Sequence, residues 1–386
     1  MNIRSEVKAI NDTVINWRRD FHQYPELGFK EFRTSRIIAE TLKSFGMKPK
    51  TGVGKTGVTA DLNFGEGPTI ALRADMDALP MQEISELPFS SKNDGVMHAC
   101  GHDGHMAMLL GTAKIFSQME NTLSGTIRFI FQPAEEGGGG ARYMIEDGCL
   151  EGVDEIYGIH IWNYQPVGEV GIKEGPVLAA ADLFDITIDG VGGHGATPQG
   201  TIDTVVVAAH LIQALQTIVS RNTNPLESTV ITIGQINGGH NFNIIADRVR
   251  LEGTTRAYTE ENRLMIEKRM NEVIEGVAKS FGAKITFNYQ HGYPPTVNHS
   301  EATMKVLKAA KNVVDLGAGE PYLSMGGEDF SYYLQKVPGC FFFVGSAPQD
   351  EKEFNIPHHC SHFNLDESAL SIGISIYLNL IEDILR

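Results

Sequence analysis

Apolar strand patterns alternate with helical patterns over the first 162 residues, and this alternation restricts the fold more than any other feature. Strand patterns occupy residues 56–64, 69–75, 125–133 and 154–162, and helical patterns occupy 5–22, 31–45, 104–119 and 140–148. Strands that alternate with helices are typical of a mostly parallel sheet with helices on both faces. The sequence therefore predicts an α/β fold for this part of the chain.

The pattern changes near residue 180. The segment LFDITID, residues 183–189, alternates apolar and polar side chains, as a sheet with one face in water does. A helix, two strands, a second helix and a strand follow at 203–220, 228–236, 247–257, 260–281 and 283–290. This order is that of a ferredoxin-like α/β sandwich. Because helical and strand patterns resume from about residue 298, we predict a discontinuous domain of residues 1–180 and 293–386, interrupted by an inserted domain of residues 181–292.

The composition disfavours several classes of protein. A chain of 386 residues exceeds the usual limit for one core, which favours two domains. The net charge of −16, from 32 basic and 48 acidic residues, disfavours nucleic acid or an anionic membrane as a partner. The sequence starts without the apolar segment of a secretory signal, has no long apolar run, and carries four widely spaced cysteines. We therefore expect a cytoplasmic protein with reduced thiols.

The stretch MHACGHDGHMA, residues 97–107, concentrates potential metal ligands. Cys100 and His102 are two residues apart, at the junction between a loop and a predicted helix. A thiolate and an imidazole at this spacing can bind one metal ion, or one each of a pair, and a thiolate can bridge two ions. The alternative, from this stretch alone, is a buried cysteine followed by a histidine at the start of the helix.

Two more apolar strands end in side chains that can bind metals. Residues 129–141, FIFQPAEEGGGGA, run from a strand into Glu135 and Glu136, and His160 lies near the end of the strand pattern at 154–162. Because ligands bind at the carboxyl ends of parallel strands, we expect these three side chains to share one rim. One glutamate can bind a metal while its neighbour acts as a general base. A polar strand end is the alternative.

The loop NIPHHCSHF, residues 355–363, adds three histidines, and the spacing does not decide which of them binds a metal. One of them would complete a set of five ligands. Five ligands, one of which bridges, suit two divalent ions that share a water molecule. Such ions lower the pKa of that water to about 7 and polarise a carbonyl group, so a site of this kind hydrolyses amides.

Nine motifs along the chain resemble those of one known family. They are RADMDALP (73–80), MHACGHDGH (97–105), FQPAEEGGGGA (131–141), GIH (158–160), GVGGHGATP (190–198), FNIIAD (242–247), GTTRAY (253–258), GGEDFSYY (326–333) and HHCSHFNLDE (358–367). The chain resembles the M20 family of metallopeptidases and aminoacylases over essentially its whole length. Within this family it is similar to the M20D group, which contains N-acyl-amino-acid amidohydrolases, hippurate hydrolases and hydrolases of indole-acetyl amino acids.

The resemblance implies two divalent ions (Mn, Zn, Co or Ni) and a role for each of their neighbours. The metal ligands would be Cys100 as the bridge, His102 and His160 at one ion, and Glu136 and His359 at the other. Glu135 would be the general base. The last motif reads HHCSHF and lacks the proline that is usual in the group, so His358 remains a rival to His359.

The resemblance also implies roles outside the ligand set. Asp75 would orient a ligand without touching the ions, although an ordinary turn aspartate is an alternative. In the inserted domain, His194 would reach across a dimer to stabilise the oxyanion, and Asn243 would lie near it. Arg256 would hold the α-carboxylate of the substrate. From the sequence alone, a surface arginine and loop residues are the alternatives. The inserted domain would then be a lid and dimerisation domain, and the protein a homodimer or a tetramer.

The implied reaction is hydrolysis of an N-acyl-L-amino acid, with an acetyl, benzoyl or similar group released as a carboxylic acid. A dipeptidase or carboxypeptidase would use the same chemistry with a different acyl pocket. A non-catalytic metal-dependent binding protein is a third interpretation, but it would not need the second carboxylate of Glu135. The expected partner is a small-molecule N-acyl amino acid or dipeptide, and neither a nucleic acid nor a membrane.

Overall fold

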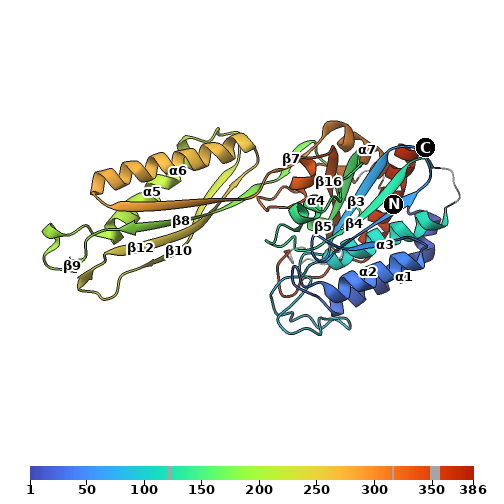
Figure 1. The fold of residues 1–386 in the computed structure, drawn as a ribbon, viewed down its shortest axis with the longest axis horizontal. Coiled ribbons are helices and arrows are strands. Elements are labelled where there is room, and N and C mark those ends of the chain that lie inside the picture. Colours follow the sequence, from blue (N-terminus) through green and yellow to red (C-terminus); the bar gives the residue numbers. More distant parts are fainter. Residues whose placement is uncertain (120–122, 315–316, 348–356) are drawn as a thin grey trace. The chain divides into compact units, whose positions relative to one another are not determined.

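The computed structural model describes residues 1–119, 123–314, 317–347 and 357–386, and its chain divides into two compact units (Figure 1). Unit 1 consists of Met1–Val177, Val297–Leu323 and Asp329–Arg386, and unit 2 of Leu178–Thr296 and Ser324–Glu328. The predicted boundaries lie after residues 180 and 292, close to those of the two units. The short segment Ser324–Glu328, which groups with the inserted unit, was not predicted.

An eight-stranded sheet forms the centre of unit 1. Its strands, in chain order, are β1 (Lys50–Val53), β2 (Gly57–Asn63), β3 (Thr69–Asp75), β4 (Thr126–Gln132), β5 (Glu155–Pro166), β6 (Val170–Gly171), β15 (Ala318–Gly319) and β16 (Gly339–Ala347). Their order in the sheet is β1-β2-β4-β3-β5-β16-β6-β15. The central strands β4, β3, β5 and β16 are parallel, whereas β1, β2 and β4 pair antiparallel, as do β16 and β6. This confirms the predicted α/β fold.

Helices pack against this sheet or against one another through buried apolar side chains. They are α1 (Ser5–Gln23), α2 (Phe32–Ser44), α3 (His102–Gln118), α4 (Gly140–Glu146), α7 (Ser300–Lys311), α8 (Ser331–Leu334) and α9 (Ser368–Leu385). Helix α3 contacts α1, α9 and β3, and almost all of its side chains are buried. This fixes the start of α3, which follows Cys100, against the centre of the sheet.

Unit 2 is a four-stranded antiparallel sheet with two helices. Its main elements are β8 (Ala180–Asp189), α5 (Thr204–Arg221), β10 (Thr229–Gly238), β12 (Arg248–Ala257), α6 (Glu260–Phe281) and β13 (Lys284–Tyr293). The sheet order β10-β12-β8-β13 is that of the predicted ferredoxin-like sandwich. On β8 the apolar residues Phe184, Ile186 and Ile188 are buried, as their alternation predicted.

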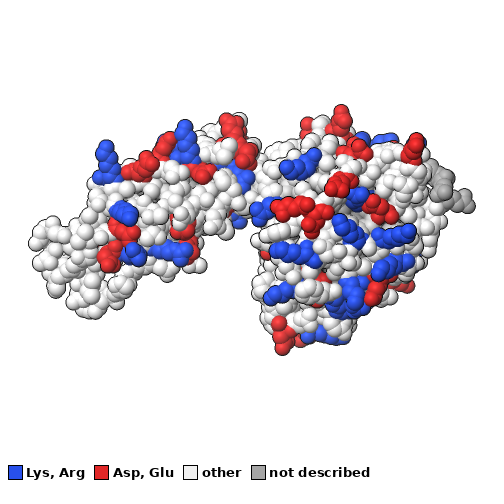
Figure 2. Space-filling model, viewed as in Figure 1, with Lys and Arg blue, Asp and Glu red and all other residues white. Residues whose placement is uncertain are grey.

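The remaining short elements are β7 (Gly175–Leu178), which pairs with β14 (Thr296–Asn298), β9 (Gly193–His194), which pairs with β11 (Ile244–Ile245), and a 3-10 turn at Pro198–Gly200. By length and composition alone, α5 and α9 are apolar enough to cross a membrane, and 78% of the α9 segment is buried inside unit 1. Lys, Arg, Asp and Glu side chains are interspersed on the face drawn in Figure 2.

Candidate metal centre

The carboxyl ends of the central strands of unit 1 carry the predicted ligands. Asp75, the last residue of β3, pairs with Gln132, the last residue of β4. The parallel register of β3 and β5 pairs Arg73 with Gly158, two residues before Asp75 and His160 respectively. The loop that follows β4 carries Glu135 and Glu136 from the same edge. This edge is where ligands bind in parallel sheets.

Five side chains come together here. One donor atom each of Cys100, His102 and His160 lie within 4.8 Å of one another, and the same holds for Cys100, Glu136 and His359. The Sγ atom of Cys100 lies 3.5 Å from Nε2 of His160. On the other side, Nε2 of His359 lies 3.1 Å from Oε1 of Glu136. Cys100 belongs to both groups and therefore occupies the position of a bridging ligand. Its role and those of the other four residues as ligands stay predictions.

The chemistry of these donors fits the implied pair of divalent ions. The Nε2 atom of His102 is buried and has no hydrogen-bond partner among the described residues, which is costly unless an ion or ligand satisfies it. Its Nδ1 lies 2.8 Å from the main-chain oxygen of Asp77 and donates to it, so Nε2 is the nitrogen that could offer a lone pair to a bound ion. Sulfur, imidazole and carboxylate donors together suit zinc and related transition metals.

Negative charge is concentrated around these donors. Desolvation, followed by repulsion from Glu136 and Glu135, raises the pKa of the Cys100 thiol well above its usual value. Desolvation alone would lower the pKa of His102, but the nearby carboxylates, Asp75 first, raise it to about 10. Both pKa shifts have the same cause in part, because the surrounding carboxylates favour a positive charge on His102 and oppose a negative charge on Cys100. A bound cation would supply that charge and turn the thiol into a thiolate.

Asp77 organises the centre, and the sequence analysis missed it. Its two carboxylate oxygens accept the backbone N–H groups of Glu135 and Glu136, each at 2.9 Å. Its main-chain oxygen accepts the hydrogen bond from His102 described above. Only 1% of Asp77 is exposed. The signal was present in RADMD, where a second aspartate follows Asp75 by two residues, directly after the strand.

Asp75 lies beside two histidines of the centre, and its role in orienting a ligand stays a prediction. Its Oδ1 accepts a hydrogen bond from Nδ1 of His105 at 2.6 Å, and its Oδ2 lies 3.7 Å from Nε2 of His102. The Nε2 atom of His105 accepts the N–H of Ile161 at 2.8 Å. Both ring nitrogens of His105 are therefore engaged, so His105 supports Asp75 and leaves no donor for an ion, although it lies close to Asp75 and His102.

The structure separates the two rival histidines of the last motif. His359 faces Glu136 and belongs to the ligand group of Cys100, whereas Nε2 of His358 accepts the N–H of Asn163 at 3.1 Å. The backbone of His359 has a φ of 62°, in the left-handed region that is unfavourable for a non-glycine residue. Such strain is often found at functional positions.

The loop between β4 and α4 is shaped by backbone features. Ala134, which precedes the two glutamates, has a φ of 52°. The buried carboxylate of Glu31 accepts its N–H at 2.9 Å, and Asp329 accepts the N–H of Ala141 at 3.0 Å. Gly140 is required here, because a Cβ atom would lie 1.7 Å from the main-chain oxygen of Pro133. Buried carboxylates thus hold both ends of this loop.

The remaining predicted residues belong to unit 2. His194 on β9 and Asn243 are exposed and adjacent, since the N–H of Gly195 donates to the oxygen of Asn243 at 2.9 Å. Arg256 lies near the carboxyl end of β12, whereas Asn243 precedes the start of that strand. Its guanidinium donates to the hydroxyl of Thr254 and, at 2.9 Å, to the main-chain oxygen of Thr255, with no carboxylate in ion-pair distance among the described residues. Burial lowers its pKa. The structure therefore brings His194 and Asn243 together but not Arg256.

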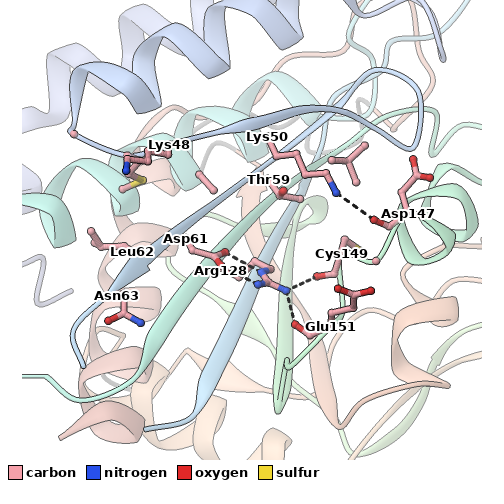
Figure 3. A pocket seen from close by; sticks show the side chains of 15 residues that line it. Lys48, Lys50, Thr59, Asp61, Leu62, Asn63, Arg128, Asp147, Cys149 and Glu151 are labelled. Carbon is pink, nitrogen blue, oxygen red and sulfur yellow. Dashed lines mark hydrogen bonds and ion pairs between the residues drawn. The ribbon is translucent and has the colours of Figure 1, made fainter. Parts of the chain in front are cut away.

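A hollow of about 600 Å³ lies elsewhere in unit 1 (Figure 3). Residues of β1, β2 and β4 line it, and none of the predicted site residues does. Arg128 donates to both carboxylate oxygens of Asp61 at 2.8 Å and to the main-chain oxygens of Cys149 and Glu151. Its charge is thus neutralised, and the hollow has no evident connection with the metal centre.

Comparisons with known proteins agree with the motifs. A sequence model of peptidase family M20/M25/M40 matches residues 71–383. The chain is 45% identical to the putative amidohydrolase YhaA of Bacillus subtilis, over 95% of this chain and 93% of that protein. It is 44% identical to N-acetyl-L-cysteine deacetylase of the same bacterium, over 94% and 86%. It is 41% identical to IAA-amino acid hydrolase ILR1-like 4 of Arabidopsis thaliana, over 96% and 85%.

Solved structures give the same result. A putative aminohydrolase from methicillin-resistant Staphylococcus aureus superposes with a TM-score of 0.93 at 36% identity, over 98% of both chains. The YXEP protein of Bacillus subtilis, described as a dinuclear metal binding peptidase, superposes with a TM-score of 0.85 at 38% identity, over 97% of this chain and 98% of that one. The chain is therefore a hydrolase that belongs to peptidase family M20, close to its M20D group.

Proposed function

We propose that the protein hydrolyses the amide bond of N-acyl-L-amino acids, with Glu135 as the general base beside two divalent ions. The observation that carries this proposal is the position of Cys100, which is shared by two groups of metal-binding side chains. One donor atom each of His102, Glu135 and Glu136 lie within 4.8 Å of one another, so Glu135 lies next to these groups. It is available as a base because the five other side chains suffice as ligands.

The residues of the chain divide the work of the reaction. When bound, the ions would lower the pKa of a water molecule to about 7 and polarise the carbonyl under attack. Glu135 takes one proton from the attacking water and delivers it to the nitrogen of the leaving amine, so the amide C–N bond breaks and a C–O bond forms. Asp77 holds the backbone of Glu135 in place for both proton transfers.

The relatives support an N-acyl amino acid as substrate. They include two deacetylases of N-acetylcysteine and a hydrolase of IAA-amino acids at 41–44% identity. A second candidate is a carboxypeptidase, because the chain is also 41% identical to thermostable carboxypeptidase 1 of Saccharolobus solfataricus. Both substrate classes end in an α-carboxylate. We propose that Arg256 binds this group, since its planar guanidinium is half-buried and lacks an ion-pair partner among the described residues.

We further propose that the protein acts as a homodimer in which His194 serves the site of the partner subunit. On β12, Arg248 pairs with Asp189 and Arg256 pairs with Ala181, eight residues along the strand. At about 3.4 Å per residue these positions are roughly 27 Å apart. His194 follows the Asp189 end of β8. One amino-acid substrate cannot span that length, so the His194 and Arg256 that act on it would come from different subunits.

The test is a substrate panel on protein reconstituted with Mn²⁺, Co²⁺, Zn²⁺ or Ni²⁺. Hydrolysis of N-acetyl-L-methionine or hippurate but not of glycyl dipeptides is the expected result, and the reverse preference would favour the carboxypeptidase. Elemental analysis of the wild-type protein and of Cys100→Ser accompanies the panel, because loss of the bridging sulfur should lower the metal content and the rate together. If none of the substrates is hydrolysed, the interpretation as a metal-dependent binding protein is the one that remains.

A further inference from the structure

A row of aromatic rings extends from the metal centre along β5. His160, Trp162 and Tyr164 are separated by one residue each, so they point to the same face of the strand. The ring centroids of His160 and Trp162 are 5.3 Å apart, and those of Trp162 and Tyr164 are 4.9 Å apart. His160 and Trp162 are each 6% exposed, whereas Tyr164 is half-buried. The row therefore leads from the predicted ligand outward.

Tyr322 continues this row to the surface of unit 1. Its ring stacks on that of Tyr164, with centroids 5.3 Å apart and planes 21° apart. Its main-chain oxygen accepts the indole N–H of Trp162 at 3.0 Å, which ties its backbone to β5. The residue is 58% exposed. An accessible aromatic ring whose position is fixed by two contacts has the properties of a binding platform.

The outer part of the row lies near the reacting centre. The ring of His358 packs at 5.3 Å from that of the predicted ligand His160. The ring of His358, the neighbour of the predicted ligand His359, packs at 5.0 Å from Trp162 and at 5.4 Å from Tyr164. Ring contacts therefore connect the predicted ligand His160 with Tyr164, both through Trp162 and through His358. An acyl group that extends from the metal centre along this row would meet these rings.

The row carries no cation. Nε2 of His358 accepts the N–H of Asn163, so this nitrogen is unprotonated and the ring is neutral. Trp162, Tyr164 and Tyr322 contribute only an indole and two phenols. A carboxylate would find no counter-charge in these four described side chains, whereas an aromatic ring would find faces and edges for stacked or edge-to-face contact. The row thus suits the acyl end of an N-acyl amino acid and not its carboxylate end.

We propose that Tyr164 and Tyr322 form the binding platform for the acyl group and give the protein a preference for aromatic acyl groups over acetyl. This inference rests on the proposed amide hydrolysis. The platform contacts the substrate away from the bond that breaks, so it acts mainly on KM.

The test compares N-benzoyl-L-methionine with N-acetyl-L-methionine, which differ only in the acyl group. The wild-type protein is expected to have the higher kcat/KM for the benzoyl substrate. Tyr322→Ala should lower the benzoyl-to-acetyl ratio of kcat/KM about tenfold, through KM, as expected for one aromatic contact. Tyr322→Phe is the matched control, because it keeps the ring and should keep the ratio.

The outcomes separate the two proposals. If the wild-type protein hydrolyses both substrates and Tyr322→Ala leaves the ratio unchanged, the platform is wrong while the proposed function stands. The same holds if Tyr322→Phe lowers the ratio as much as Tyr322→Ala does. A wild-type protein that hydrolyses neither substrate under any of the four metals would overturn the proposed function and this inference with it.

Discussion

The main-chain oxygen of Asp77 lies 2.8 Å from Nδ1 of His102 and fixes the tautomer of that ring. The carboxylate of the same aspartate accepts the N–H groups of the two glutamates in the loop after β4. One buried residue therefore sets the geometry of a predicted ligand and of the predicted base. Removal of a group that holds a metal ligand in place commonly lowers metal affinity or activity by about 10- to 100-fold.

Asp77→Asn should lower kcat about 10- to 100-fold with little loss of secondary structure. Asparagine keeps the main-chain oxygen for His102 but offers one side-chain acceptor in place of two, so one glutamate N–H faces an NH₂ group. Steady-state kinetics and circular dichroism measure the two effects. Asp61→Asn is the control, because Asp61 pairs with Arg128 away from the metal centre. Unchanged kcat in Asp77→Asn would refute the role of Asp77.

The adjacent glutamates are expected to respond differently to the same substitution. Glu135→Gln should abolish turnover and keep both metal ions, because an amide cannot accept the proton of water but is not needed as a ligand. Glu136→Gln should lose metal content as well as activity, since Glu136 faces His359 in one ligand group. Elemental analysis beside a rate assay distinguishes them. The assignment fails if Glu135→Gln stays active, or if it loses metal to the same extent as Glu136→Gln.

Mixing two inactive variants tests the proposed dimer. In a heterodimer of His194→Ala and Glu135→Gln, one of the two sites combines an intact Glu135 with an intact His194 from the other subunit. Some activity should therefore return after the subunits are exchanged: about half of the wild-type rate for each heterodimer, and about a quarter for an equimolar mixture in which about half of the dimers are heterodimers. The control is each variant alone, taken through the same exchange. If exchange is demonstrated and no activity returns, His194 acts within its own chain or not at all.

Much of the fold could be predicted because periodicity reports burial directly. The helix expected at 260–281 is observed at Glu260–Phe281, and the strand expected at 69–75 is observed at Thr69–Asp75. Both elements have strong local signals, such as Thr259 capping the first turn of α6 and Gly282 ending it. The two-residue strands, such as β9 and β11, could not be predicted, because their pairing depends on distant segments and not on a pattern of their own.

The site was predictable where side chains carry their own chemistry. Glu136 and His160 follow or end apolar strand patterns and Cys100 lies two residues before His102, so each was singled out from its context, although its role as a ligand stays a prediction. Asp77 and Glu31 were not, because their function is to accept backbone N–H groups of a loop that is remote in sequence. The second aspartate of RADMD marks Asp77 as unusual, but the local sequence does not show which amides that carboxylate will face. Only the fold brings them together.

Glu31 gives a prediction for stability and pH. Burial raises the pKa of Glu31 from 4.5 to about 7, while its carboxylate accepts hydrogen bonds from Thr56 at 2.5 Å and from Ala134 at 2.9 Å. The folded protein therefore holds this proton more tightly than the unfolded chain does. The stabilisation is fully present below the unfolded pKa and is lost as the pH rises through about 7.

Glu31→Gln removes this titration while keeping the shape of the side chain. The free energy of unfolding of the wild-type protein should fall relative to that of Glu31→Gln between pH 4.5 and 8, by up to about 3 kcal/mol. Urea unfolding of the metal-free protein at both pH values measures the difference. Glu40→Gln, an exposed glutamate on α2, serves as the control and should track the wild-type protein across the range. A constant difference between Glu31→Gln and wild type would mean that Glu31 has the same pKa in the folded protein and in the unfolded chain, so that burial does not raise it.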